Sequence, residues 1–364
     1  MDNFRKEFAQ KLSETVITST TSSEETERMA KELVRSITAI LPRSIFKYRA
    51  STIRNIEALA KNMTYGVPMS FMNDPMDGLV YVDKEAIFKQ AKFGLSKDFI
   101  DLVKSTKELP GALSLYMDEE TGESILKTIL QAFEQEVEDL IKRNEQANTH
   151  ILAGLDKFIN DKIKELQETS LVASFSETPY NNSMWAYYAE NHTGFVVEYA
   201  VQGARFDHCF YCKHQNSQKC KDNKIQGYLS PIIYQKERVD ATLWMDSFIG
   251  QYILQQTGLL KKTYTPDVLF PHRICLIKGE QWAHEKEWRV VCRIGEPCEK
   301  GKVKALPTPI PSAIYYGTYI APESLSMLRG IIRALSMENN CEIKEYQMMI
   351  DHSSKDFKLK AVLL

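Results

Sequence analysis

The sequence lacks a charge bias, a long apolar run and a secretion signal. Its 364 residues include 46 Lys and Arg against 48 Asp and Glu, a formal net charge of −2. A near-neutral chain gives no electrostatic argument for nucleic acid or an anionic membrane as a partner, although a local basic patch for nucleic acid stays open. No stretch reaches bilayer-spanning length, and the N-terminus has no apolar signal-peptide core. We therefore expect a soluble, cytoplasmic protein with no membrane partner, and a toxin secreted without a classical signal is the alternative.

The patterns of cysteine and glycine argue against two further classes of protein, those with a disulfide framework and those with a doubly wound fold. The seven cysteines are odd in number and scattered, which argues against a disulfide framework and for a reducing compartment. No glycine-rich loop leads from a predicted strand into a helix, so a doubly wound nucleotide-binding fold is not expected. Repeats and low-complexity tracts are also missing. The composition, 43% apolar and 26% charged, is that of a globular protein.

Helical spacing of apolar residues dominates two regions. Residues 1–43 predict an N-terminal helical arm, with a capping box at Ser22 and Glu25 and a stop at Pro42. Residues 97–169 predict a helical insertion whose main feature is a hairpin of two long helices with its break near 144–148. The arm or the insertion could pack on the rest of the chain or form a homodimer.

The remaining segments alternate between the two secondary-structure types. We expect the fold class α+β, with a mixed, mostly antiparallel sheet, the helical-hairpin insertion and the N-terminal helical arm. Residues 44–364 then form one catalytic-like domain, interrupted by the insertion at 97–169 and by a Cys-rich insertion at 205–228. Strands are predicted at 45–49, 64–71, 171–176, 194–199, 288–294, 313–316, 342–350 and 357–364, and shorter helices at 51–59, 182–190, 239–258 and 324–337.

Three short polar segments fall on or beside predicted strands. They are Tyr48-Arg49, Ser174-Phe175-Ser176 and Glu285-Lys286-Glu287. Alternation along a strand places both serines on one face, and both glutamates as well if that strand starts early enough. Polar groups are costly to bury without hydrogen-bond partners, so two polar side chains on the same face of a core strand require an explanation. One reason is a site for a dinucleotide that is cleaved at a glycosidic bond, where arginine holds phosphate and a carboxylate stabilises the developing positive charge.

This order of Arg, Ser-x-Ser and Glu-x-Glu is similar to the arginine–serine–glutamate class of ADP-ribosyltransferases. The resemblance implies that NAD is the substrate and that Arg49 positions it. Ser174 and Ser176 would be the serine pair, Glu287 the catalytic glutamate and Glu285 the residue on the acceptor side. The spacing between the serines and the glutamates is longer here than in that class.

A second resemblance covers more of the chain. The sequence resembles a bacterial family known only as a domain of unknown function, noted near abortive-infection and phage-defence genes. The segments that carry it are Phe46-Lys47-Tyr48-Arg49, Met69 to Asp77, Ser174 to Glu177, Met184 to Ala189, His192 to Phe195, and Glu285 to Arg289. Candidate cofactor-binding residues from these segments are Tyr48, Arg49, Asn73, Asp74, Ser174, Ser176, Trp185, Tyr188, His192 and Arg289.

Structural roles compete with each of these assignments. Arg49 could form a buried ion pair with Glu287 or Asp74, and Asn73-Asp74 has the composition of a turn. Trp185 and Tyr188 could belong to the core, and His192 could simply end a helix.

The Cys-rich segment offers a possible zinc site. Cys209, Cys212, His214 and Cys220 are four ligands of the type that zinc prefers. A closed structural site is one interpretation, and reduced cysteines in a surface loop are the other.

Two other functions compete with an NAD-dependent transferase that modifies a macromolecule as a defence toxin. Asp74, Asp77, Glu285 and Glu287, with Lys286, could gather Mg²⁺ in a metal-dependent nuclease or phosphodiesterase. The same residues could instead form the pocket or core of a non-catalytic binding module, whose helical regions contact protein partners.

Overall fold

Eleven strands form one large sheet in a computed structural model that describes residues 3–94, 96–109, 117–135, 137–208, 225–256, 260–293 and 304–364. The strands are β1 (Ser44–Arg49), β2 (Met63–Pro68), β3 (Ser170–Ser176), β4 (Phe195–Ala200), β5 (Arg205–His208), β6 (Ile225–Pro231), β9 (Glu287–Arg293), β10 (Lys304–Pro307), β11 (Ala313–Tyr316), β12 (Lys344–Ile350) and β13 (Leu359–Leu363). Their order is β13-β12-β11-β4-β1-β3-β9-β6-β5, and β2 joins β10 to β3. Only β11 and β12 pair in parallel among these described strands. The predicted α+β class with a mixed, mostly antiparallel sheet is confirmed.

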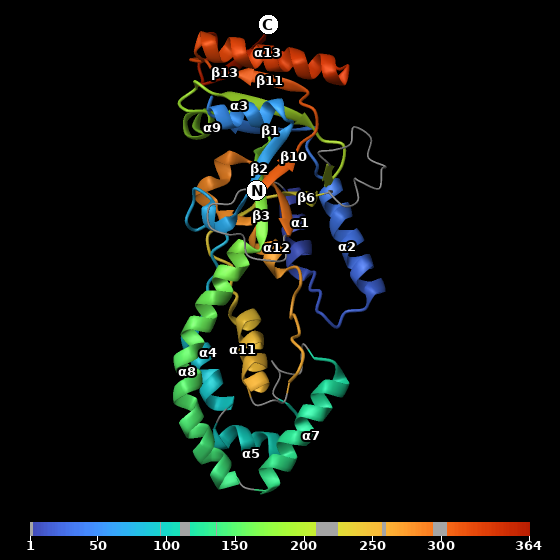
Figure 1. The fold of residues 1–364 in the computed structure, drawn as a ribbon, viewed down its shortest axis with the longest axis vertical. Helices are drawn as coiled ribbons and strands as arrows, with labels where there is room; N and C mark the ends of the chain where they lie inside the picture. The colour runs from blue at the N-terminus through green and yellow to red at the C-terminus, as the bar shows by residue number, and fades with distance from the viewer. Residues whose placement is uncertain are drawn as a thin grey trace.

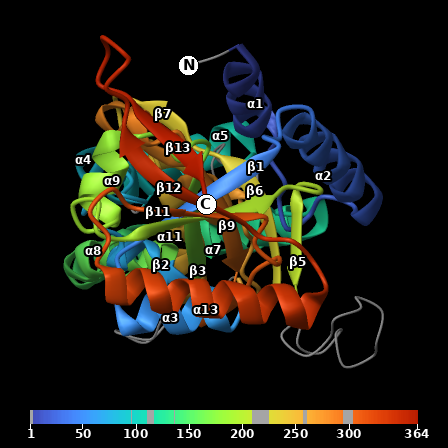
Figure 2. The ribbon, with the colours of Figure 1, turned by 90° about the horizontal axis from the view of Figure 1, so that it is seen from above.

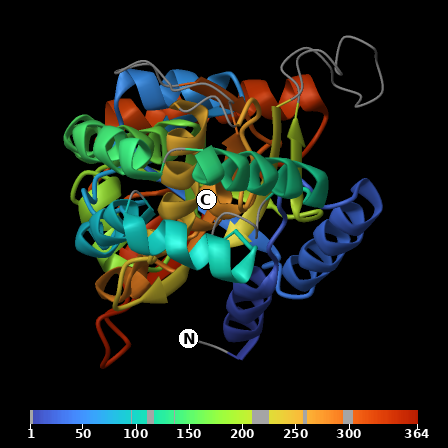
Figure 3. The same cartoon turned by 90° about the horizontal axis from the view of Figure 1, so that it is seen from below.

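Helices cover the sheet and extend beyond it. Helices α3 (Ile53–Ala60) and α13 (Pro322–Asn339) pack side by side (Figure 2). A helical lobe extends away from the sheet (Figure 1), and its helices lie in front of the sheet in the view from below (Figure 3). Its helices are α4 (Lys84–Gly94), α5 (Lys97–Thr106), α7 (Glu119–Gln135), α8 (Val137–Glu168) and α11 (Thr242–Gln256). In the described part of the chain, no helix combines the length and apolarity needed to cross a bilayer.

The smaller elements connect these parts. They are α9 (Asn182–Tyr188), α12 (Phe270–Ile274), the 3-10 helices η1 (Met69–Phe71) and η2 (Glu280–Glu285), and the two-stranded parallel sheet of β7 (Ile233–Gln235) and β8 (Ile277–Gly279). Strand β8 and helix η2 lead directly into β9, so one short stretch of chain supplies several of the polar residues described below.

The N-terminal arm packs on the main core. Phe8 and Leu12 of α1 (Asn3–Glu14) and Leu33 and Ile37 of α2 (Ser23–Thr38) are buried in the same apolar cluster as β3 and β9. Ser22 caps α2 by accepting a hydrogen bond from the main-chain N–H of Glu25, as the sequence predicted.

Three local predictions were wrong. The long helices of the insertion do not break at 144–148, because α8 runs through those residues, which include neither Gly nor Pro. The helix predicted at 51–59 begins later, at Ile53 of α3, because Thr52 is its N-cap. Strand β2 ends at Pro68 instead of continuing to Phe71, since a proline has no N–H to extend the ladder and a 3-10 turn follows.

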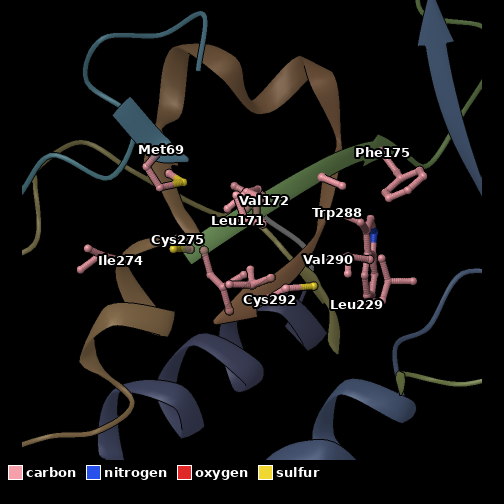
Figure 4. Packing of buried hydrophobic residues seen from close by; sticks show 14 of the residues in the cluster. Met69, Leu171, Val172, Phe175, Leu229, Ile274, Cys275, Trp288, Val290 and Cys292 are labelled. Carbon is pink, nitrogen blue, oxygen red and sulfur yellow. The ribbon is translucent and has the colours of Figure 1, made fainter. Parts of the chain in front are cut away.

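Three apolar clusters stabilise the described part of the molecule, and one of them lies around Tyr48 and Trp185, beside β1 and α9. The main core surrounds β3 and β9 and includes Phe175, Trp288 and Val290 (Figure 4). A separate cluster, which we call the lobe core, lies at the far end of the helical lobe. It consists of Ile100, Val103, Leu109, Met117, Ile125, Ile129, Leu254, Leu260 and Tyr264.

Candidate functional site

A fork in the sheet exposes one edge of β3. Strand β9 pairs with β3 along its full length, from Ser170 to Ser176. On the opposite edge, β1 meets β3 only at Ser176, and β2 meets it only at Val172 and Leu171. The two neighbours diverge, so no described strand is paired with residues 173–175 on this edge. A pocket occupies the gap.

The pocket has a volume of about 200 Å³. It is lined by Phe46, Lys47, Tyr48, Tyr65, Val67, Met72, Asn73, Val172, Ser174, Phe175, Ser176, Met184, Tyr188, Lys278, Glu285 and Glu287. Segments far apart in sequence therefore contribute to one concave site. It brings together the predicted serine pair, both predicted glutamates, Tyr48, Asn73 and Tyr188.

Buried ion pairs organise the floor of this pocket. The ammonium Nζ of Lys278 lies 2.6 Å from Oε2 of Glu285, 3.0 Å from Oε2 of Glu287 and 3.8 Å from Oδ2 of Asp77. Arg289 joins the same network through Nε, 2.7 Å from Oε1 of Glu287, and through Nη2, 2.7 Å from Oδ2 of Asp77. All five side chains are at most 4% exposed. Such a network is stable only because nearly every charge has a close partner.

The network fixes the protonation state of Glu287. Burial favours the neutral acid, but Arg289 and Lys278 outweigh burial and lower the pKa of Glu287 to about 2. A hydrogen bond to the side chain of Ser174 also favours the charged form. Glu287 is therefore an anion at neutral pH.

Glu285 contacts the same ammonium group, that of Lys278, from a different secondary-structure element. Strand β9 begins at Glu287, and Glu285 is the last residue of η2. The intervening Lys286 has a positive φ of 47°, which is uncommon for a residue with a Cβ and marks a constrained turn. This turn lets the glutamates on either side of it both contact Lys278.

Polar side chains from two further elements complete the wall. The hydroxyl of Tyr188, in α9, donates a 2.6 Å hydrogen bond to Oε1 of Glu285. The same hydroxyl accepts a 2.7 Å hydrogen bond from Nδ2 of Asn73. Burial, Glu285 and its hydrogen bond raise the pKa of Tyr188, so this hydroxyl stays protonated and remains a donor. The hydroxyl of Ser176 donates a 2.7 Å hydrogen bond to the carbonyl of Glu285.

Arg49 contacts main chain in place of the glutamates. Its Nη1 and Nη2 donate hydrogen bonds to the carbonyls of Asn55 (3.2 Å) and Met63 (2.9 Å). Arg49 is not among the described residues that line the pocket, and neither of the predicted ion pairs, with Glu287 or Asp74, is formed. Its observed contacts connect β1 to the segment around α3 and the start of β2.

Four other predicted residues lie outside the pocket wall. Trp185 is fully buried and donates to the carbonyl of Pro179. Its ring stacks on His192, which borders a different surface hollow beside the β12–β13 turn. Asp74 accepts a hydrogen bond from the N–H of Met76, within the turn that its sequence indicated. The fourth, Arg289, lies behind the pocket wall and forms an ion pair with Glu287.

The proposed zinc ligands Cys209, Cys212, His214 and Cys220 lie outside the described residues. Within the described ranges, no group of three or more His, Cys, Asp or Glu side chains is arranged to hold a metal ion.

The sequence reasoning missed two lysines of the site. Lys278 follows directly on the apolar run from Ile274 to Ile277, and Lys47 lies between two aromatic residues on β1. A charged residue inside an apolar strand was the available signal, because a buried lysine requires a partner.

Part of this site lies in a segment of the chain that matches a known family model. Residues 184–290 match the model of a family described as a protein of unknown function, DUF2971. The match spans Tyr188, Lys278, Glu285 and Glu287 and ends before β10; β1, β2 and β3 lie before it. It supports the resemblance to a family of unknown function. No curated protein and no solved structure matches this chain.

Proposed function

We propose that this protein is an NAD-dependent enzyme, similar to ADP-ribosyltransferases, that transfers ADP-ribose to a macromolecule from the pocket in the fork of the sheet. One observation carries the proposal. Glu287 is an anion that lines a pocket beside Ser174 and Ser176, three residues that the resemblance named, although Arg49 does not join them there. An anion in this position suits a reaction that passes through a cationic sugar.

The chemistry of NAD matches an ionised carboxylate. When the bond between ribose C1′ and the nicotinamide nitrogen breaks, its electron pair stays on the nitrogen and nicotinamide leaves as a neutral molecule. No acid is needed to protonate the leaving group. Positive charge develops on the ribose, and an anion such as Glu287 stabilises it. Glycosidases with poorer leaving groups need a carboxylic acid of raised pKa, and Glu287 has a lowered one.

Glu285 is suited to act on the acceptor, which is the group that receives ADP-ribose. As the lone pair of the acceptor forms a new bond to C1′, the acceptor must lose a proton. In our proposal Glu285 accepts or orients that proton, and Tyr188 and Lys278 hold the carboxylate in position. The transferred atoms and charges then balance with no further reactant.

The size of the pocket limits what it encloses. Its volume of about 200 Å³ is below the ~300–1,000 Å³ that drug-sized ligands occupy. We infer that the pocket encloses the part of NAD around the cleaved bond, and that the adenosine end lies across the mouth, near the exposed Asn73. In this proposal Arg49 supports β1 and does not touch NAD.

The alternatives are less well supported. In a metal-dependent nuclease, a divalent cation would sit among Asp77, Glu285 and Glu287, but the ammonium of Lys278 takes that position. A binding module would not require Glu287 to be ionised beside a pocket. A role as a cytoplasmic toxin in phage defence belongs to the proposal and rests on the family resemblance.

Titration of the purified chain with NAD, followed by measurement of nicotinamide release with and without bacterial lysate, tests the proposal. The key variant is Glu287→Gln, which keeps the shape of the side chain but removes its charge. The matched control is Glu57→Gln on α3, where the glutamate is exposed. We expect NAD to bind wild type and both variants, and release to fall about 100- to 1,000-fold only in Glu287→Gln.

Because Glu287→Gln disturbs a buried network, Ser174→Ala is a second variant that changes no charge. It removes one hydrogen bond to Glu287 and should slow release about tenfold. If folded wild type neither binds NAD nor releases nicotinamide, the proposal is wrong and the pocket belongs to a binding module.

A further inference from the structure

Lys47 is the pocket cation that has no carboxylate partner. Its Nζ donates one hydrogen bond, 2.7 Å long, to the carbonyl of Ser174. Nζ also lies 5.5 Å from the centre of the Phe175 ring. No ion pair between Lys47 and a carboxylate occurs in the described part of the chain, whereas Lys278 contacts three.

The position of Lys47 follows from the fork. Ser174 lies at the centre of the unpaired edge of β3, where its carbonyl lacks a partner strand. Lys47 supplies a hydrogen bond in place of that strand. In an antiparallel strand, the N–H and the carbonyl of one residue point toward the same side. The N–H of Ser174 therefore points toward Lys47 and the pocket.

Two donors of Lys47 are left for a ligand. An ammonium group has three N–H donors, and Ser174 uses one. Together with the main-chain N–H of Ser174, they make a donor-rich subsite at one end of the pocket. At the acidic end, Glu285 and Glu287 are paired with Lys278 and Arg289 and make no ion pair with Lys47. An incoming anion would therefore be drawn to Lys47.

We propose that Lys47 and the open edge of β3 at Ser174 form the subsite that binds the phosphate groups of the nucleotide. For NAD these are its pyrophosphate groups, and that identification rests on the proposed function. Ser174 then connects the two halves of the site, since its carbonyl contacts Lys47 and its side chain hydrogen-bonds Glu287. Sugar and phosphate would bind on either side of one residue.

The charges around Lys47 support an anion here. Burial and the neighbouring Arg49 lower the pKa of Lys47 to about 8, and Glu287 only partly opposes them. Glu285 and Lys278 also line this pocket, and both are already paired with each other. A phosphate would supply the negative charge that Lys47 otherwise lacks.

Steady-state kinetics with two substrates test the subsite. NAD contains pyrophosphate, and nicotinamide riboside presents the same glycosidic bond without phosphate. Lys47→Met should raise KM for NAD about 10- to 100-fold with little change in kcat. It should leave KM for nicotinamide riboside unchanged. Lys47→Arg should restore most of the NAD affinity, and Lys344→Met, at an exposed strand lysine, should behave as wild type.

Binding of inorganic pyrophosphate separates this inference from the proposed function. If wild type does not cleave NAD but binds pyrophosphate in a manner that requires Lys47, the transferase proposal fails and the subsite stands. If NAD is cleaved and Lys47→Met changes both substrates equally, or neither, the subsite is refuted and the transferase proposal stands. If the folded protein neither cleaves NAD nor binds pyrophosphate, the transferase proposal and the subsite are both refuted.

Discussion

The helical lobe and the fork of the sheet bury different kinds of side chain. The lobe core consists of apolar side chains and one tyrosine, and the buried Gln251 beside it is uncharged. Charged pairs elsewhere in the lobe, such as Lys84–Asp156, are exposed to solvent. In the fork, Lys278, Arg289 and Glu287 are almost fully buried. Apolar residues of similar volume often stabilise a protein as well as a buried ion network does. This difference agrees with our proposal that the fork retains its charges for a ligand.

Breaking the ion network should have the largest effect on folding. Arg289→Met leaves Glu287 and Asp77 buried with one cation fewer, which should lower the free energy of unfolding by about 3–5 kcal/mol. Urea denaturation measures this change. Arg28→Met on α2, where both ion pairs are exposed, should leave the unfolding midpoint unchanged. Equal midpoints for the two variants would contradict the contrast between fork and surface.

A cavity in the lobe core should destabilise the protein without changing the pocket. Ile125→Ala removes a buried side chain from α7 and should lower the free energy of unfolding by about 2–5 kcal/mol. NAD affinity, measured well below the melting temperature, should match that of wild type. A parallel loss of affinity would show that the lobe and the fork are coupled.

Removing one hydroxyl from the pocket wall should have a smaller effect. Tyr188→Phe deletes the hydrogen bond to Glu285 and the acceptor for Asn73, while keeping the ring in place. We expect a loss of about 1.5 kcal/mol in stability and a slower transfer to the acceptor. Tyr187→Phe, on the exposed face of α9, is the matched control. Indistinguishable behaviour of the two variants would remove Tyr188 from the site.

The weakest expected effect is a pH dependence of NAD binding. The charged fraction of Lys47 falls as pH rises through its pKa of about 8, so affinity for NAD should fall several-fold between pH 7 and pH 9. Nearby Glu287 has a pKa of about 2, and arginine remains charged, so neither titrates in this range. Calorimetric titrations of Lys47→Arg should show a flat profile. A wild-type profile that is equally flat would contradict a role for Lys47.

The sequence predicted the strands of the fork but not how they meet. Periodicity identified the region of β3, and Ser174 and Ser176 were placed on one face. The divergence of β1 and β2 depends on long-range pairing, which no local pattern records. For the same reason the side chain of Arg49 was expected beside Glu287, whereas it contacts the carbonyls of Asn55 and Met63.

The sequence also left two local features unpredicted, the true course of the long helix α8 and the importance of Lys278. The long insertion was recognised from its apolar spacing, but a run of Asn and Gln was mistaken for its break, although such residues are tolerated within a helix. Lys278 was overlooked because a single lysine in a short apolar strand has no motif. Its importance becomes visible only when Glu285, Glu287 and Asp77 surround it.

The central claim is that the ionised Glu287 stabilises positive charge on a ribose. Single-turnover release of nicotinamide from NAD, compared between wild type and folded Glu287→Gln at saturating NAD, tests it most directly. The account predicts unchanged NAD affinity and a release rate lower by about 100- to 1,000-fold in the variant. Equal release rates from both proteins would contradict the account and leave Glu287 as a structural member of the buried network.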